Sequence, residues 1–328
     1  MATKVRQQIP VATPNSSHPN PLISHKKLRQ LYSMMLQCRL LDERVGIVMK
    51  QPRFANDHYS SVGQEATAVG AAIDLRPADT LAPPHRDFIL SYLKGVPLTA
   101  MFSQLYGRNT RPENGRSALD DCGYAQLNVV LAASTVAAQL EVCIGIAFAN
   151  QRKKNDNVVM AFSGEGSIPL NDWHDALRFA GQRSLPIVFV RQGHLSAGSI
   201  SVNFESAGDD TGSGAVGYGF PGITVDGNDA VAVYRVAQEA IERARSGGGP
   251  TLIEAQIFPG YGSHEIDHAQ DRAADEVSNW VSRDPILAME RYLTGKGLFS
   301  EGWKKEIIVL FQRELDAAVE VAEKDSRG

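Results

Sequence analysis

The sequence predicts an α/β fold, a doubly wound and mostly parallel sheet flanked by helices. Two short apolar runs, 157–162 and 185–190, enclose a helical stretch at 171–181. A strand–helix–strand unit of about thirty residues joins parallel strands. Farther along, the segments GITVDG and TLIEAQIF enclose a second helical stretch at 229–247. Strands that alternate with helices in this way are typical of a doubly wound sheet.

The elements before this unit are mostly helical. Residues 1–23 are rich in Pro, Ser, Asn and Gln and predict a flexible arm, whereas 24–328 predict a single α/β domain with C-terminal helices. Apolar residues recur at helical spacing from Ser24 to Lys50. The sequence next predicts a helix of small residues at 61–75, an amphipathic helix at 88–107, a polar surface loop at 108–128 and a buried, nearly uncharged helix at 134–152.

The elements after the unit are equally regular. A glycine-rich loop is predicted at 207–222, before the strand GITVDG and the helix at 229–247. TLIEAQIF, at 251–258, predicts a further strand. From residue 284 to the C-terminus the pattern predicts two or three surface helices.

The composition limits the classes of function. The chain has 328 residues, 43% of them hydrophobic, and a formal net charge of −4, which is ordinary for a globular protein. It carries no basic stripe interleaved with aromatic residues, so we expect no nucleic-acid partner. No apolar run reaches the ~20 residues of a membrane helix, and the N-terminus lacks the apolar centre of a secretory signal. We therefore expect no membrane association and a cytoplasmic location.

The cysteines give no sign of a metal or redox site. Cys38, Cys122 and Cys143 are odd in number and do not have the spacing of metal ligands. We interpret each as a small core residue of a protein in a reducing compartment.

Polar and glycine residues follow the two strands of the central unit. The first strand runs into SGEG at 163–166, and the second into RQGH at 191–194. In such sheets ligands bind at the carboxyl ends of strands, and neighbouring strands lie about 5 Å apart. The glycines let the backbone approach a phosphate, and a divalent cation would have to lie between that phosphate and Glu165. The alternative interpretation is a plain strand-to-helix turn in which Glu165 is a capping charge.

A second glycine-rich segment suggests a different ligand site. Residues 212–217 match the spacing of the dinucleotide-binding fingerprint. That fingerprint requires a strand before it and a helix after it, whereas SAGDD precedes and YGFPG follows here. The motif therefore predicts a mobile loop.

Several segments along the chain occur together in one order: SVGQEA at 61–66, His85-Arg86, GRS at 115–117, the helix with Gln139, the unit from Gly164 to His194, VDGND at 225–229, the run 243–254 and RDP at 283–285. Together they resemble the alpha subunit of the first, decarboxylating component of 2-oxo-acid dehydrogenase complexes. The resemblance runs from about residue 24 to the C-terminus, and it implies the thiamine-diphosphate-binding fold of the diphosphate-binding domain type.

The resemblance implies a metal site and a cofactor site. In that family a Gly-Asp-Gly segment and an Asn-Asn pair hold magnesium and the diphosphate. By correspondence, Glu165, the His194 side chain and the Ser196 carbonyl would bind the metal. The implied cofactor-binding residues are His85, Arg86, Gln139, Gly164, Glu165, Gly166, Ser167 and Gly193.

This chain departs from the family pattern at the metal ligands. Glu165 stands for aspartate and adds a methylene, and His194 stands for asparagine. Mg²⁺ prefers oxygen ligands, whereas imidazole suits softer metals. Two interpretations follow: the site takes a softer cation such as Mn²⁺, or it no longer binds the cofactor. Gln192 is a third candidate, as an amide oxygen ligand.

A second departure lies after the strand TLIEAQIF. Pro259 stands for the family's arginine and Ser263 for its histidine, with His264 one place on. We take His264 as the candidate catalytic acid or base. The alternative is that His264 and His268 are loop residues facing solvent.

Arg86 and Gln139 each have two possible interpretations. Arg86 is suited to bind a diphosphate through its planar guanidinium, and the alternative is a surface ion pair with Asp87 or Asp79. Gln139 lies on a helix that lines the family's cofactor cleft, and a buried structural amide is the other interpretation.

The resemblance implies oxidative decarboxylation of a 2-oxo acid, of pyruvate, branched-chain or acetoin type, with acyl transfer to a lipoyl carrier. The cofactors would be thiamine diphosphate and a divalent cation, Mg²⁺ or Mn²⁺. A separate beta subunit would supply the pyrimidine-binding domain in an α2β2 heterotetramer, and a lipoyl-bearing acyltransferase is a further implied partner. The alternative function is a non-catalytic structural or regulatory paralogue that keeps the fold and the subunit interfaces but has lost normal cofactor binding.

Overall fold

Five parallel strands form the centre of the structure, a computed structural model that describes residues 23–51, 60–84, 89–106, 123–130, 138–164, 171–194, 215–257 and 283–325. The strand order is β1-β2-β3-β5-β4, and every neighbouring pair is parallel. This confirms the predicted parallel sheet. The strands are β1 Thr80–Ala82, β2 Val159–Gly164, β3 Ile187–His194, β4 Gly222–Asp226 and β5 Thr251–Ile257.

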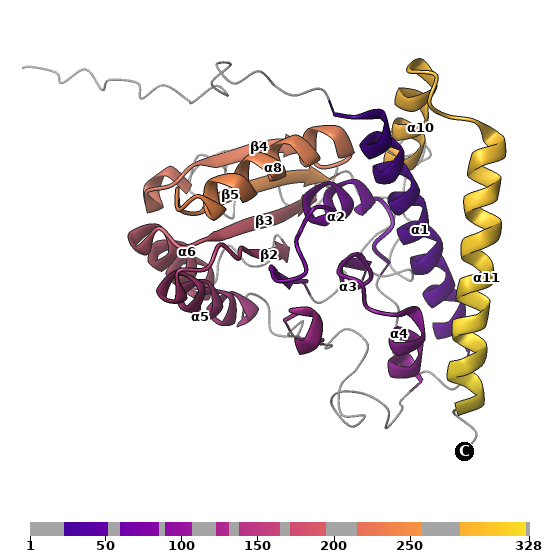
Figure 1. Cartoon of the computed structure of the whole chain (residues 1–328), viewed down its shortest axis with the longest axis horizontal. Coiled ribbons are helices and arrows are strands. Elements are labelled where there is room, and N and C mark those ends of the chain that lie inside the picture. Colours follow the sequence, from indigo (N-terminus) through magenta and orange to yellow (C-terminus); the bar gives the residue numbers. More distant parts are fainter. Residues whose placement is uncertain are drawn as a thin grey trace, which may run out of the picture.

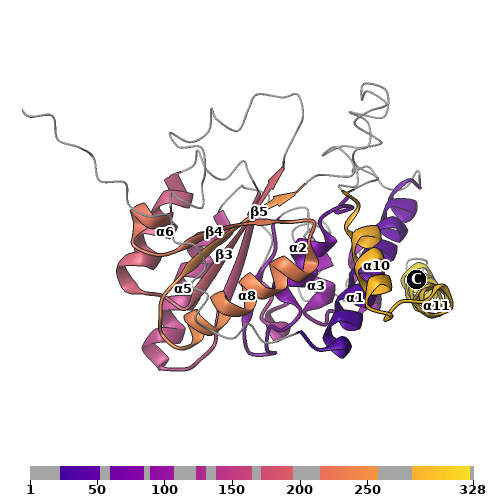
Figure 2. The ribbon, with the colours of Figure 1, turned by 90° about the horizontal axis from the view of Figure 1, so that it is seen from above.

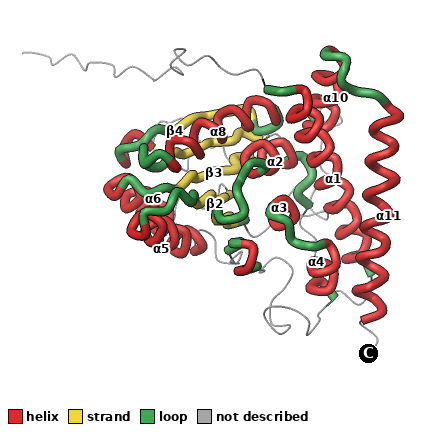
Figure 3. The backbone as a smooth tube through the Cα atoms, viewed as in Figure 1, coloured by secondary structure: helices red, strands yellow, loops and turns green. Residues whose placement is uncertain are grey.

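Helices cover both faces of the sheet (Figures 1 and 2). One face carries α5 and α6, and the other carries α2 and α8. Behind α2 and α8 lie further helices, with α11 outermost beside α1, as the tube in Figure 3 also shows. The helices are α1 His25–Met49, α2 Glu65–Ala72, α3 Ile89–Leu93, α4 Leu98–Leu105, α5 Ala138–Lys153, α6 Asn171–Arg183, α8 Ala230–Arg245, α10 Pro285–Gly295 and α11 Glu301–Asp325.

Alternate residues of the central strands enter two separate cores. In β3, Val188 and Val190 pack with the core on the α2 and α8 side, while Ile187 and Phe189 pack with α5 and α6. All four side chains are fully buried. A strand covered on both faces must be apolar throughout, which explains the continuous apolar runs in the sequence.

The predicted amphipathic helix at 88–107 is wrong as a single element. The structure has two helices there, α3 and α4, separated by residues 94–97. Gly95 has a φ of +92°, which ends the first helix, and Pro97 precedes the second as its N-cap. Proline clashes with the preceding turn of a helix but is tolerated where a helix begins, so the break follows from local chemistry.

The region around β1 also differs from the prediction. Strand β1, which has only three residues and pairs with β2, is not predicted by the sequence pattern. Tyr124, expected in a surface loop, is buried, and it bridges to Val129 beside Leu81. Residues 108–122 of that predicted loop lie outside the described residues.

Helix α5 is less buried than its lack of charge predicts. Cys143 and Ala147 are fully buried, but Val142 is 52% exposed. A methyl group added at Gly145 would meet nothing within 4 Å. Helix α5 therefore has one buried face and one exposed face, and Val142 lies on the exposed one.

The remaining predictions have mixed outcomes. Cys38 and Cys143 are buried, as expected of core residues, and burial raises the pKa of the Cys143 thiol to about 12. Ala215–Tyr218 forms a 3₁₀ turn before β4 rather than the helix that a dinucleotide fingerprint needs.

Other predictions fall largely outside the described residues. Residues 1–22, Cys122 and 212–214 belong to this group, so the N-terminal arm and the division into one domain stay predictions. Among the described helices, none is long and apolar enough to cross a membrane.

Candidate functional site

The ends of β2 and β3 lie side by side. The two strands are hydrogen-bonded neighbours in parallel register, and Gly164 pairs with Gln192. Strand β3 continues to His194, farther than the predicted end of the strand at residue 190. Arg191, Gln192 and Gly193 are therefore buried strand residues rather than part of a turn. The ends of β2 and β3 are therefore close enough to contribute to one site.

The two candidate glycines at these ends differ in their surroundings. Among the described residues, no atom lies within 4 Å of a Cβ atom built on Gly164. A Cβ atom on Gly193 would lie 3.2 Å from Arg191 Nη1 and 3.4 Å from Glu254 Oε1. No described residue therefore fills the space beside Gly164, whereas Gly193 leaves room for a buried ion pair.

Gln139, near the start of α5, points to the same end of the sheet. Its side chain is buried, and its Nε2 donates a hydrogen bond to the Phe162 carbonyl at 3.2 Å. Its Oε1 atom is buried without a hydrogen-bond partner, and so is the hydroxyl of Ser163 on β2. Buried polar atoms are nearly always paired, so these two atoms are open to a donor from a ligand.

Sequence reasoning missed a buried ion pair close to these residues. Arg191 Nη1 of β3 donates to Glu254 Oε1 of β5, and the two residues are direct neighbours in the strand register. Arg191 is 1% exposed and Glu254 5% exposed. The available signal was a charged residue inside each of two apolar strands, because a buried charge needs a partner.

Most of the predicted ligands lie outside the described residues. These are His85, Arg86, Glu165, Gly166, Ser167, Ser196, His264 and the side chain of His194. Their roles stay predictions. Among the residues that are described, no three His, Cys, Asp or Glu side chains gather closely enough to hold a metal ion.

Asp79 bears on one alternative for Arg86. Its carboxylate is fully buried and accepts hydrogen bonds from Arg245 at 2.8 and 3.0 Å and from the Val158 N–H at 2.9 Å. This pair lies at the amino end of the sheet, opposite the candidate site. Asp79 is thus already paired, which speaks against a surface ion pair between Asp79 and Arg86.

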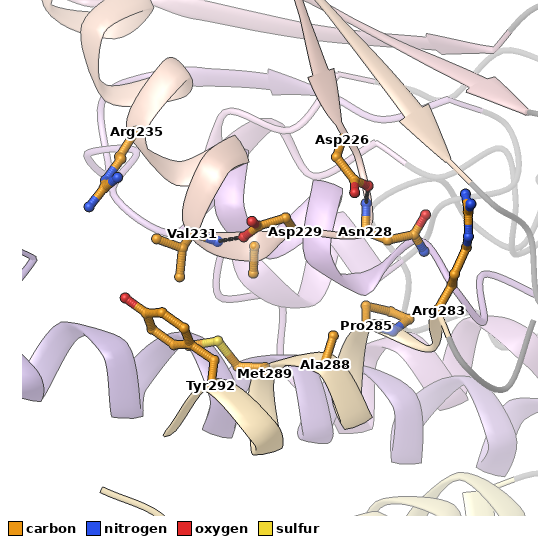
Figure 4. Close-up of a pocket in the computed structure, with 11 residues that line it drawn as sticks. Asp226, Asn228, Asp229, Val231, Arg235, Arg283, Pro285, Ala288, Met289 and Tyr292 are labelled. Atoms are coloured by element: carbon orange, nitrogen blue, oxygen red, sulfur yellow. Dashed lines mark hydrogen bonds between the residues drawn. The ribbon is translucent and has the colours of Figure 1, made fainter. Parts of the chain in front are cut away.

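A separate hollow of about 600 Å³ lies between the β4–α8 turn and α10 (Figure 4). Two segments that carry the resemblance, 225–229 and 283–285, meet there. Three polar side chains of the turn already have partners: Asp226 accepts from the Asn228 N–H, Asp229 caps α8, and Asn228 Nδ2 donates to the carbonyl of Gly63, before α2, at 3.1 Å. Strand β5 separates β4 from β3, so this hollow is distinct from the β2 and β3 ends.

Comparisons with known proteins agree with this architecture. The chain matches the family described as Dehydrogenase E1 component over residues 32–327. It is 36% identical over 287 residues to the 3-methyl-2-oxobutanoate dehydrogenase subunit alpha of Mycobacterium tuberculosis, covering 87% of this chain and 75% of the relative. It is 30% identical over 308 residues to the pyruvate dehydrogenase E1 component subunit alpha of Staphylococcus aureus, covering 92% and 80%. The chain therefore belongs to the Dehydrogenase E1 component family.

Proposed function

We propose that this chain is the alpha subunit of a thiamine-diphosphate-dependent 2-oxo-acid dehydrogenase, acting on pyruvate, a branched-chain 2-oxo acid or acetoin. It would take part in oxidative decarboxylation with acyl transfer to a lipoyl carrier. Two relatives named as alpha subunits of such enzymes support the proposal. The observation that carries it is the parallel pairing of β2 and β3, whose ends lead into Glu165 and Ser196.

The described residues fit a diphosphate at these ends. No described residue fills the space where a Cβ atom of Gly164 would lie, and the Oε1 atom of Gln139 is buried without a donor. A loaded site brings donors, such as water molecules bound to a cation, that would satisfy this acceptor. Dehydrogenase E1 components depend in general on thiamine diphosphate, which supplies the carbanion chemistry when bound.

Residues of this chain would bind the cation and the cofactor diphosphate and orient them. Glu165, His194 and the Ser196 carbonyl would hold the divalent cation, and the guanidinium of Arg86 would bind the diphosphate. His264 would donate or accept a proton at the reacting group. The imidazole of His194 favours Mn²⁺ over Mg²⁺, because nitrogen ligands suit softer cations.

The proposal requires a beta subunit with the pyrimidine-binding domain, in an α2β2 assembly. The uncovered face of α5 suits such a partner. Val142 is 52% exposed, Phe179 of the adjacent helix α6 is 36% exposed, and Gly145 allows close approach. Exposed apolar side chains that gather on neighbouring helices are typical of subunit interfaces.

A variant of α5 tests this interface. Val142→Glu should weaken assembly, because it places a charge in an apolar contact, and size-exclusion chromatography with light scattering measures the loss. Val309→Glu is the matched control, since Val309 is 47% exposed on the distant helix α11. Equal effects of the two variants would argue against an α5 interface.

Cofactor titration tests the function itself. The chain is co-purified with its beta subunit and titrated with thiamine diphosphate in the presence of Mg²⁺ and then Mn²⁺. A ligand that binds only the folded state raises the melting temperature, so we expect a cation-dependent rise. Glu165→Ala should abolish the rise, whereas Glu239→Ala, on the exposed face of α8, should not.

The same titration separates the proposal from a non-catalytic paralogue. Loss of cofactor binding predicts no change of melting temperature with either cation at millimolar cofactor, while the α–β assembly remains intact. That outcome would refute the proposed activity and leave the family membership standing.

A further inference from the structure

One row of residues crosses the sheet just before the strand ends. The register aligns Ser163 of β2 with Arg191 of β3, Arg191 with Glu254 of β5, and Glu254 with Thr224 of β4. In β2, β3 and β5 the residues that precede this row on the α5 and α6 face are apolar and buried. The row therefore replaces the apolar core by polar groups at the carboxyl end of the sheet.

The ion pair in this row is a costly feature. Arg191 and Glu254 share the face of Ile187 and Phe189, under α5 and α6. Replacing a buried ion pair by well-packed apolar residues is often neutral or stabilising, because desolvation offsets the attraction of the charges. Stability alone is thus a weak reason for two charges here.

The guanidinium of Arg191 extends toward the end of β3. Its Nη1 atom lies 3.2 Å from where a Cβ of Gly193 would be, two residues closer to the strand end. Only glycine leaves this space free. The positive charge therefore lies beside the backbone that leads directly into His194.

Unpaired polar atoms lie in the ion pair itself and in the residues next to it. Glu254 uses Oε1 for Arg191, while its Oε2 atom is buried without a partner. The Ser163 hydroxyl in the same row is also unpaired, as is Gln139 Oε1. Each of these side chains is at least 95% buried. Unpaired buried polar atoms cost free energy, and they cluster where a ligand completes the site.

We propose that Arg191 and Glu254 are positioning residues for the cofactor diphosphate, an inference that rests on the proposed function. The pair ties the ends of β3 and β5 together, and Gly193 lets the guanidinium support the backbone before His194. The loop after β3 would then start from a fixed position. The cost of burying two charges is offset by a site that is already ordered when the diphosphate arrives.

The test compares two double variants of the α–β assembly. Arg191→Met/Glu254→Leu removes both charges at the carboxyl end of the sheet. Arg245→Met/Asp79→Asn removes the matched buried pair at the amino end. The assay measures the melting temperature without cofactor and the Kd for thiamine diphosphate at saturating Mn²⁺.

The two variants should separate stability from cofactor binding. For Arg191→Met/Glu254→Leu we expect a Kd raised about tenfold or more with an unchanged or higher melting temperature. For Arg245→Met/Asp79→Asn we expect a changed melting temperature and a Kd within about twofold of wild type. A purely structural pair at the carboxyl end would give the second pattern in both variants.

Gly193→Ser provides a second arm that keeps both charges. Its side chain would displace the guanidinium, so the Kd should rise even where the double variant fails to fold. Wild-type Kd in either folded variant would overturn the inference while the proposed function stands. A flat titration of the wild-type assembly with both cations would overturn the proposed function, and the inference with it.

Discussion

Replacing Gln139 by methionine distinguishes a cofactor contact from a structural amide. Methionine has nearly the same length and volume but no strong donor or acceptor. The substitution removes the hydrogen bond from Nε2 to the Phe162 carbonyl, and it also removes the unpaired Oε1 atom. The two roles therefore predict different effects on stability and on cofactor affinity.

The free energies can be worked from these contacts. Losing the 3.2 Å hydrogen bond costs about 0.5–1.5 kcal/mol, while removing an unsatisfied buried acceptor returns about 1–3 kcal/mol. Gln139→Met should therefore leave the cofactor-free assembly as stable as wild type or slightly more stable. If the loaded site donates to Oε1, about 1.4 kcal/mol of binding is lost and the Kd rises about tenfold.

Thermal unfolding and cofactor titration measure the two quantities. The matched control is Gln104→Met, because Gln104 is equally buried and accepts a hydrogen bond from the Tyr124 hydroxyl at 3.0 Å. The control should lose stability and keep its Kd. The reasoning is refuted if Gln139→Met lowers the melting temperature but binds thiamine diphosphate as tightly as wild type.

Three further predictions concern the scaffold around the site. Gly181→Ala should destabilise the chain by about 1–3 kcal/mol or more in chemical denaturation, because its Cβ would collide with the Tyr218 carbonyl oxygen; Gly145→Ala, in open space, should not. Asp79→Ala should cost about 3–5 kcal/mol in the same assay, because it removes the carboxylate that pairs with the largely buried Arg245 side chain and leaves the Val158 N–H without its acceptor. Cys143 should resist thiol reagents at pH 8 while the chain is folded. Burial keeps this thiol protonated in the folded state up to a pKa of about 12, whereas the unfolded state ionises above pH 9.0, so stability should fall between these two pH values by at most about 1.4 kcal/mol per pH unit. Cys143→Ala should remove that part of the pH dependence of unfolding.

The sequence predicted best those parts of the fold that depend on short, local patterns. The apolar runs before Gly164 and Arg191 predicted two buried strands, and the short helix between them predicted parallel neighbours. Both follow from periodicity and connection length, which are local properties. The break at Gly95 and Pro97 was equally local and was overlooked because apolar spacing continues across it.

Other features depend on contacts that a single sequence does not reveal. Strand β1 is only three residues long and is defined by its pairing with β2. The partner of Arg191 is Glu254, 63 residues away, and only the strand register brings them together. Val142 was expected in the core because an apolar residue has the same signature in a sequence whether its side chain is buried or exposed.

The most direct measurement is an anomalous diffraction map of the α–β assembly with thiamine diphosphate and Mn²⁺. Our account predicts one manganese peak per alpha subunit at the shared edge of β2 and β3, in contact with Glu165 and His194. A peak elsewhere in the chain, or bound cofactor without manganese between these two strand ends, would contradict it.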